Sequence, residues 1–384
     1  MHISSDFDGG NIECLACEKA DDIQLNIRLD NQSEFYQWFY FRLTGAQGQA
    51  CRLRLMNAAD SAYADGWEGY QAVASYDREH WFRVETEYSN GELVINHRPL
   101  QNSVYYAYFA PYTMERHHDF IAAVSQSNRV SYERLGATLD GQDMDLLTVS
   151  DPELQLIDEE GNGTPKKPLW VIARQHPGET MAEWWMEGFL DRLLDQDDPV
   201  SRECLRRANF FVVPNMNPDG SRRGHLRTNA CGANLNREWI GASMERSPEV
   251  YLVREKMKAT GCDFCLDVHG DEALPYNFIA GGEGIESWND RHQNLLDTFK
   301  DTLARISPDF QTEHGYPIDP PKSADLQKCT DYIAETFDCL SMTLEMPFKD
   351  TIDTPDELEG WSPERCRQLG RANLDAIFQM IDQL

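Results

Sequence analysis

The sequence is poor in positive charge and in long apolar runs. Its 35 Lys and Arg residues stand against 65 Asp and Glu residues, which gives a formal net charge of -30. Because nucleic acid and anionic membranes repel such a chain, neither is an expected partner, and an acidic substrate would need a local basic pocket. No apolar run approaches the roughly 20 residues of a membrane helix. Residues 1–13 also lack the basic start and apolar stretch of a signal peptide. We therefore expect a soluble cytoplasmic protein.

Without a sign of export, the ten cysteine residues are expected to be reduced thiols rather than disulfides. Two CxxC pairs occur, Cys14 with Cys17 and Cys262 with Cys265. Each pair could supply half of a zinc knuckle, but the pairs lie far apart and neither has a partner pair nearby. We favour plain burial of the thiols for both pairs.

The first part of the chain, residues 1–150, has the pattern of short antiparallel strands. Aromatic and alternating segments recur there, broken by Gly, Asn and Asp. These segments are Phe35–Leu43, Cys51–Met56, Trp81–Val84 and Ser103–Phe109. A length of 384 residues suits two domains, and we predict an all-β sandwich as the first. Residues 158–168 are rich in turn formers and predict a hairpin or connector.

In residues 151–384 apolar strands alternate with helical segments. The predicted strands are 169–173, 210–213, 264–268 and 340–344, and the predicted helices are 180–195, 247–260, 288–306 and 363–384. Ser247 and Pro248 are typical of a helix start. This alternation predicts an α/β fold, with parallel strands and helices on both faces of the sheet. Functional groups in such folds gather beyond the carboxyl ends of the strands.

Possible metal ligands follow two of these strands. His176 and Glu179 lie in a short His-Pro-Gly-Glu segment after the first strand, and His269 follows the third. Two imidazoles and one carboxylate would leave the fourth position of a tetrahedral zinc ion open for water, as in catalytic sites. Taken singly, the His-x-x-Glu pattern is common by chance, and a lone histidine is more often a hydrogen-bonded core residue. Their shared position beyond the strands favours the metal site.

Three further polar residues occupy comparable positions. Asn236 and Arg237 would together suit a free carboxylate, which an amide and a guanidinium fork bind through paired hydrogen bonds, although they would also suit a solvated loop. Glu345 ends an otherwise apolar strand. It is either an ion-paired edge residue or a general base, poised by partial desolvation to take a proton from water.

Taken together, the ordered motifs resemble those of the M14 metallocarboxypeptidases, and most closely the cytosolic carboxypeptidase subfamily with its bacterial members. The motifs are His-x-x-Glu at 176–179, Asn-x-Asn-Pro-Asp-Gly at 215–220, Asn-Leu-Asn-Arg-Glu-Trp at 234–239, Asp-Val-His-Gly at 267–270, and Glu345 on a strand. Residues 37–42 and 106–112 are similar to aromatic segments of that subfamily's N-terminal β-sandwich. The resemblance covers most of the chain. It implies that residues 151–384 form a carboxypeptidase-like catalytic domain, a mixed sheet flanked by helices.

The resemblance implies one zinc ion, held by His176, Glu179 and His269. It also implies that Glu345 is the catalytic base, which activates water and later protonates the leaving amine. The expected substrates are the C-termini of peptides or proteins, from which acidic residues would be removed.

The resemblance also implies a set of substrate-binding residues. Asn236 and Arg237 match the pair that binds the terminal carboxylate of the substrate. Arg227 matches the arginine that polarises the scissile carbonyl and stabilises the oxyanion, although Arg222 and Arg223 lie close by.

The chain departs from the family pattern at two points. The family often has Asp where this chain has Asn234, and a neutral amide would orient a histidine ligand but raise its basicity less. The active-site tyrosine has no secure match, since Tyr316 and Tyr332 are both candidates. Lys328 lies about where a basic specificity residue is expected, although it would equally suit an exposed surface position.

We predict a zinc-dependent metallocarboxypeptidase. One alternative is a zinc amidohydrolase acting on N-acyl amino acids, which would use similar residues but lacks a preceding sandwich domain. The other is a catalytically inactive peptide-binding protein, which the intact set of predicted ligands and Glu345 disfavours. The natural substrate and the oligomeric state stay open.

Overall fold

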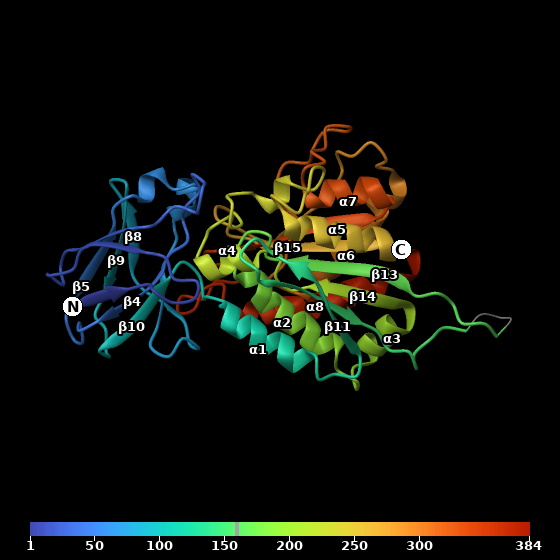
Figure 1. Ribbon diagram of the computed structural model, residues 1–384, viewed down its shortest axis with the longest axis horizontal. Coiled ribbons are helices and arrows are strands. Elements are labelled where there is room, and N and C mark those ends of the chain that lie inside the picture. Colours follow the sequence, from blue (N-terminus) through green and yellow to red (C-terminus); the bar gives the residue numbers. More distant parts are fainter. Residues whose placement is uncertain (158–160) are drawn as a thin grey trace.

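Two five-stranded β-sheets make up residues 1–112 of the computed structural model, which describes residues 1–157 and 161–384 (Figure 1). The first sheet has the order β1 (His2–Ser4), β4 (Tyr40–Thr44), β10 (Ser103–Ala107), β6 (Val73–Ser75) and β7 (Phe82–Arg83). The second has the order β2 (Glu13–Ala16), β3 (Ile23–Asn26), β5 (Cys51–Leu55), β9 (Glu92–His97) and β8 (Thr86–Ser89). Two short 3-10 helices, η1 (Ala58–Asp60) and η2 (Ala64–Trp67), lie between strands.

The alternation in the sequence decides which faces of these sheets meet. In β5, Leu53 and Leu55 are buried while Arg52 is exposed, which is the period of two expected for a strand with one buried face. In β4, Phe41 is buried and its ring stacks on Tyr106 of β10, with 5.4 Å between ring centroids. Side chains of both sheets belong to one hydrophobic cluster. This confirms the predicted N-terminal β-sandwich.

The second part of the chain contains one seven-stranded mixed sheet. Its order is β11 (Val130–Ala137), β12 (Asp143–Val149), β14 (Ala208–Val213), β13 (Lys167–Ala173), β15 (Phe264–Asp271), β17 (Leu340–Pro347) and β16 (Phe278–Ala280). Strands β14, β13, β15 and β17 run parallel, and the strands at both edges are antiparallel. The four parallel strands are the four that the apolar segments predict.

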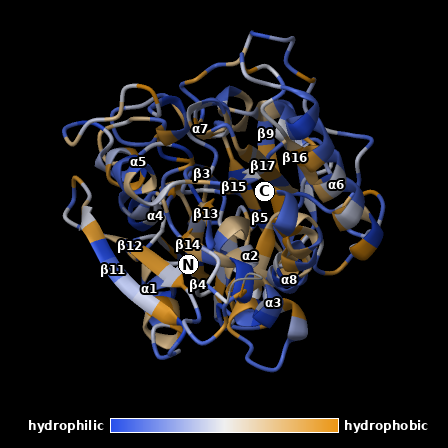
Figure 2. Ribbon diagram, turned by 90° about the vertical axis from the view of Figure 1, so that its right-hand side faces the viewer, coloured by the Kyte–Doolittle hydropathy of each residue, from blue (hydrophilic) through white to orange (hydrophobic). Residues whose placement is uncertain are grey.

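Helices cover both faces of this sheet. Leu169 and Val171 of β13 pack in a cluster with α2 (Met181–Leu193), α6 (Asp290–Ile306) and α8 (Pro363–Met380). Trp170 and Ile172, on the other face, pack in a cluster with α5 (Pro248–Thr260) and α7 (Cys329–Phe337). Figure 2 shows the sheet between these two groups. The remaining helices are α1 (Met114–Val124), α3 (Pro199–Arg207), α4 (Pro218–Arg223), η3 (Leu235–Arg237) and η4 (Ile381–Gln383). Within the described residues, no helix combines the length and the apolarity needed to cross a membrane.

The strands on either side of the predicted boundary at residues 150/151 belong to one sheet. Strand β12 pairs with β14, and β11 pairs with β12, so residues 130–149 lie in the seven-stranded sheet, although the predicted boundary placed them in the first domain. We propose a boundary near residue 112 instead. Of the predicted connector at 158–168, residues 158–160 lie outside the described residues, and an isolated antiparallel bridge joins Ile157 to Gly163.

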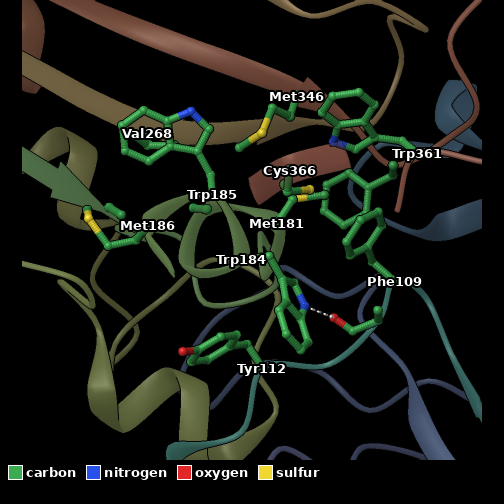
Figure 3. Packing of buried hydrophobic residues seen from close by; sticks show 14 of the residues in the cluster. Phe109, Tyr112, Met181, Trp184, Trp185, Met186, Val268, Met346, Trp361 and Cys366 are labelled. Atoms are coloured by element: carbon green, nitrogen blue, oxygen red, sulfur yellow. Dashed lines mark hydrogen bonds between the residues drawn. The ribbon is translucent and has the colours of Figure 1, made fainter. Parts of the chain in front are cut away.

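The two parts share a continuous core along α2 (Figure 3). Trp184 Nε1 donates a hydrogen bond to Ala110 O at 2.9 Å, and its ring packs edge-on against Tyr112, with 4.9 Å between centroids. Nearby, the rings of Tyr108 and Phe348 stack at 4.4 Å. The sandwich is therefore packed firmly against the sheet that carries the predicted site.

Helices α2 and α8 pack backbone against backbone, which gives a test of the core. A Cβ atom on Gly370 would lie 2.2 Å from Trp185 O. We therefore expect Gly370→Ala to lower the free energy of unfolding by about 1–3 kcal/mol, as overpacked cores do. Urea unfolding followed by circular dichroism measures this. Gly241→Ala is the control, because a Cβ there meets no atom within 4 Å. Equal stability of the two variants would contradict the close packing.

Candidate active site

His176, Glu179 and His269 meet beyond the carboxyl ends of β13 and β15. His176 and Glu179 lie in the loop from β13 to α2, and His269 lies near the end of β15. The Glu179 carboxylate is 2.7 Å from His176 Nδ1 and 2.8 Å from His269 Nδ1, and the two Nδ1 atoms are 3.2 Å apart. In the described part of the chain, this is the one group of three His, Cys, Asp or Glu side chains arranged to hold a metal ion.

Close backbone contacts shape the loop that carries two of these residues. Gly178 N donates to Leu226 O at 2.8 Å, and a Cβ at position 178 would come within 2.9 Å of that oxygen, so only glycine fits. Arg174, just before the loop, has a φ of 61°, and its Nε donates to Pro177 O at 2.9 Å. Hydrogen bonds at Arg174 and at Gly178 thus fix the conformation of the loop.

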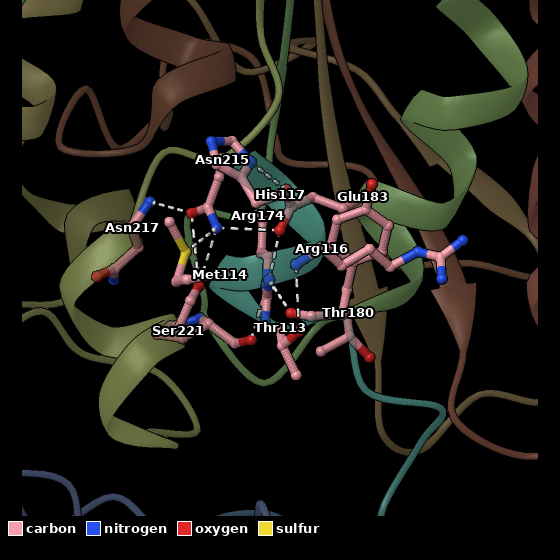
Figure 4. A network of polar contacts seen from close by, with 12 residues as sticks. Thr113, Met114, Arg116, His117, Arg174, Thr180, Glu183, Asn215, Asn217 and Ser221 are labelled. Carbon is pink, nitrogen blue, oxygen red and sulfur yellow. Dashed lines mark hydrogen bonds and ion pairs between the residues drawn. The ribbon is translucent and has the colours of Figure 1, made fainter. Parts of the chain in front are cut away.

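A buried polar network holds Arg174 in turn (Figure 4). Its Nη1 donates to Tyr112 O at 2.7 Å and pairs with the Glu183 carboxylate. Glu183 also accepts a hydrogen bond from Asn215 Nδ2 at 2.9 Å, and its other oxygen lies 2.7 Å from His117 Nδ1. The Asn-x-Asn-Pro-Asp-Gly segment that begins at Asn215 therefore supports the loop from behind.

Each histidine of the cluster has a hydrogen-bond partner on its outer nitrogen. Asp267 Oδ2 is 2.9 Å from His269 Nε2, and Asn234 Oδ1 is 3.1 Å from His176 Nε2. Asn234 thus occupies the supporting position that its place in the sequence predicts. Because a carboxylate raises imidazole basicity more than an amide does, the two histidines are supported unequally.

The electrostatics of the cluster suit a cation. Burial lowers the pKa of His269, but the carboxylates of Asp267 and Glu179 outweigh this and raise it well above its usual range. Burial and the positive charge of Arg227 lower the pKa of His176 to about 4. The buried carboxylates therefore need positive charge nearby, which a divalent ion would supply.

Glu345 lies beside the cluster on the neighbouring strand. In the parallel register of β15 and β17 it is opposite His269. Tyr316 Oη is 3.2 Å from Glu345 Oε1 and 2.7 Å from Asp271 Oδ2, whereas Glu345 Oε2 is buried with no hydrogen-bond partner among the described residues. Burial raises the pKa of Glu345 well above its usual range; His269 opposes the shift, and the carboxylates of Glu179 and Asp271 add to it. A carboxylate in this environment accepts a proton readily.

A cavity of about 700 Å³ opens in front of these residues. The four predicted substrate-binding residues line it: Arg227, Asn236, Arg237 and Lys328. Asn236 Oδ1 accepts a hydrogen bond from Cys329 N at 2.8 Å, and Arg237 Nη1 donates to Asn236 O at 2.5 Å. His176, Glu179 and Glu345 line the same cavity, and His269 contacts His176 and Glu179 at its wall.

Acidic side chains lie close to Lys328 in the cavity. Its Nζ is 3.8 Å from Asp319 Oδ2, and its side chain is 38% exposed. Asp331 is buried at the same cavity, and burial raises its pKa to about 6.

Of the two tyrosine candidates, Tyr316 is the one at the cavity, close to Glu345. Tyr332 instead packs against Trp239, with 6.1 Å between ring centroids. Tyr316 therefore has the contacts that an active-site tyrosine needs.

All ten cysteine residues have free thiols. The predicted burial of Cys262 and Cys265 is confirmed. For Cys14 it is wrong, because this residue is exposed on β2 at the edge of the second sheet, and Cys17 is only partly buried.

Sequence reasoning missed three residues at the site. Tyr63 and Glu272 line the cavity, and Asp30 lies buried behind it. Glu272 was open to prediction, because it follows the same strand as His269. Tyr63 and Asp30 belong to the sandwich and lie in no motif.

The chain matches two family profiles: one described as Cytosolic carboxypeptidase N-terminal domain, over residues 3–109, and one described as Zinc carboxypeptidase, over residues 117–364. Two solved structures are similar along the whole chain. A metallo-carboxypeptidase from Burkholderia cenocepacia is 49% identical, with a TM-score of 0.95 and coverage of 100% of both chains. A metallo-carboxypeptidase from Pseudomonas aeruginosa, in complex with (2-guanidinoethylmercapto)succinic acid, is 42% identical, with a TM-score of 0.94 and the same coverage.

A more distant relative is Cytosolic carboxypeptidase 6 of Mus musculus. It is 27% identical over 335 residues, which is 80% of this chain and 60% of the mouse protein. Together these matches confirm the resemblance drawn from the motifs and the predicted fold class.

Proposed function

The chain belongs to the M14 family of metallocarboxypeptidases, and on that premise we propose that it is a zinc-dependent enzyme that removes C-terminal residues from peptides or proteins. The observation that carries this proposal is the meeting of His176, Glu179 and His269 beside the buried carboxylate of Glu345. Because mouse relatives are named cytosolic carboxypeptidases, we also propose that it acts in the cytoplasm.

We propose that His176, Glu179 and His269 hold one zinc ion. Two imidazole nitrogens and a carboxylate are donors that zinc prefers, and three protein ligands leave a position open for water or substrate. A zinc ion bound there would lower the pKa of water and polarise the scissile carbonyl group. Asp267 and Asn234 would fix the orientation of the two imidazoles through their outer nitrogens.

Glu345 is the proposed general base. Its Oε2 has no hydrogen-bond partner in the described chain, so it is free to accept a proton from the attacking water. The same carboxyl group would then donate that proton to the amine that leaves. Tyr316 Oη, 3.2 Å from the other oxygen, holds the carboxylate in place during both transfers.

Two arginine residues and one asparagine residue of the cavity are proposed to bind the substrate. Arg227 would stabilise the negative charge that develops on the carbonyl oxygen. Asn236 and Arg237 would bind the terminal carboxylate and so restrict cleavage to the last residue. The cavity wall formed by these residues supports this assignment.

This function is tested with N-blocked peptides, by measuring release of the free C-terminal amino acid. We expect release from peptides with a free carboxylate and none from the same peptides with an amidated C-terminus, which Asn236 and Arg237 would not bind. The amidohydrolase alternative predicts hydrolysis of N-acetyl amino acids instead. Absence of both activities in the zinc-loaded protein would favour the inactive binding protein.

We propose that the enzyme prefers acidic C-terminal residues, with Lys328 as the recognition residue. Its ammonium group borders the cavity and is only partly exposed. For a peptide ending in Glu, we expect Lys328→Ala to lower kcat/KM by about 10- to 100-fold, since a partly desolvated ion pair is worth more than an exposed one. The measurement compares peptides ending in Glu, Lys and Leu.

The matched control is Lys322→Ala. This lysine is 67% exposed and pairs with Glu286, so its loss should change kcat/KM by less than about 2-fold. A preference for Glu that survives Lys328→Ala would remove this residue from the specificity pocket.

A basic C-terminal residue is the second candidate. Asp319 and Asp331 lie at the same cavity, and the Pseudomonas aeruginosa relative was solved with a ligand whose name includes a guanidino group as well as succinic acid. Under this alternative the wild-type enzyme prefers Lys, and Asp331→Asn abolishes the preference.

A further inference from the structure

The loop that carries Arg227 is tied to a carboxylate of the sandwich. Asp30 is only 2% exposed and faces three successive backbone N–H groups. Its Oδ1 accepts from Leu226 N at 2.7 Å, and its Oδ2 accepts from Arg227 N at 2.8 Å and Thr228 N at 2.9 Å. The Thr228 hydroxyl adds a fourth hydrogen bond at 3.1 Å. One side chain thus fixes the backbone on both sides of Arg227.

Two aromatic rings of the sandwich flank the guanidinium group of Arg227. The ring centroids of Phe35 and Tyr63 each lie 5.5 Å from its central carbon. Tyr63 is held in turn by Gln37, whose side chain bonds both the backbone N and O of Tyr63, at 2.8 and 3.0 Å. In the described residues Arg227 Nε is buried without a hydrogen-bond partner. Its direction is therefore set by the backbone beneath it and the rings beside it.

The same two loops meet at further points. Asn31 N lies 3.1 Å from His225 Nε2, and Asn31 Nδ2 donates to Ala230 O at 2.7 Å. At Gly232 the backbones come so close that a Cβ atom would lie 2.4 Å from Gln32 O. The loop at 30–35 is thus docked along the loop at 225–232.

From these contacts we propose that Asp30 is a positioning residue for Arg227, and that the sandwich thereby completes the active site. The inference rests on the proposed role of Arg227 in stabilising the oxyanion. A hydrogen-bond donor serves that role only when it is aimed in advance at the site of the developing charge. Asp30 holds the backbone in the required place, while Phe35 and Tyr63 restrict the side chain.

The test is a double-mutant cycle on kcat and KM, made with the full-length zinc-loaded enzyme. Asp30→Asn keeps the size of the side chain but replaces one acceptor oxygen with a donor that opposes the backbone N–H groups. We expect it to lower kcat by about 10- to 100-fold, the scale of a misplacement near 1 Å, and to change KM by less than about 3-fold. In an Arg227→Ala background the same change should alter kcat by less than about 3-fold, because its target is gone.

Two further variants separate positioning from general loosening. Phe35→Leu removes one of the two rings beside Arg227 and leaves the Asp30 hydrogen bonds intact. It should lower kcat in the wild type but not in the Arg227→Ala background. If Asp30→Asn does not fold, this variant provides the test. Asn31→Ala weakens the docked loops without contacting residues 226–228, and it should leave kcat within about 2-fold of wild type.

The outcomes distinguish this inference from the proposed function. Suppose that Arg227→Ala lowers kcat. If Asp30→Asn then lowers kcat equally in the wild type and in Arg227→Ala, or does not lower it at all, the positioning role alone is overturned. An Arg227→Ala enzyme with wild-type kcat overturns the role of Arg227 itself, and the inference with it.

Discussion

Replacing Glu345 with Gln is expected to lower kcat by roughly three orders of magnitude, in the range found for loss of a general base. The amide has the shape of the carboxylate and still accepts the hydrogen bond from Tyr316, but it cannot take a proton from water. Zinc content and KM should therefore stay close to those of the wild type, since neither depends on the proton acceptor. Steady-state kinetics on an N-blocked peptide, with metal analysis of the same sample, measures both.

Glu272→Gln is the matched control for this variant. Glu272 is a second buried carboxyl group of the same cavity, and burial likewise raises its pKa well above the usual range. It has no assigned part in proton transfer, so the expected loss of kcat is below about 10-fold. Near-normal turnover in Glu345→Gln would assign the base to another residue, and a larger loss in Glu272→Gln would point to Glu272.

The convergence of the proposed metal ligands and of Glu345 was predictable because these residues depend on strands that the sequence marks clearly. The apolar segments at 169–173, 264–268 and 340–344 are the parallel strands β13, β15 and β17, and adjacent parallel strands bring their carboxyl ends together. His269 and Glu345, 76 positions apart in the chain, become direct neighbours in that register. The motifs identified the residues, and the parallel sheet explains why they lie close together.

Contacts between the two parts were not predictable in the same way. Asp30 accepts hydrogen bonds from backbone N–H groups, which any residue except proline would present at 226–228, so no side-chain pattern marks its partner. Residues 130–149 were assigned to the first domain together with the alternating segments before them, yet β12 pairs with β14. Alternation reports one buried face but does not identify the sheet that a strand joins.

Loss of His269 is expected to abolish both metal binding and activity. We expect the wild-type protein to bind about one zinc ion per chain, to lose activity on chelation and to regain it when zinc is added, since three protein ligands define a single catalytic site. His269→Ala leaves only His176 and Glu179 as ligands, both in one loop. We expect its zinc content after dialysis to fall below about a tenth of an ion per chain, and kcat/KM to fall by at least about 1,000-fold.

Asp267→Asn provides the graded control for this prediction. It keeps all three ligands but weakens the support of His269 Nε2, so zinc affinity should fall by about 10- to 100-fold and excess zinc should restore most of the activity.

Melting temperature gives a second measurement that does not depend on turnover. Added zinc should raise it in the wild type and in Asp267→Asn but not in His269→Ala, because only a protein that binds the ion is stabilised by it. Retention of one zinc ion per chain in His269→Ala would place the metal elsewhere, and activity that survives complete removal of zinc would end the assignment of a zinc-dependent mechanism.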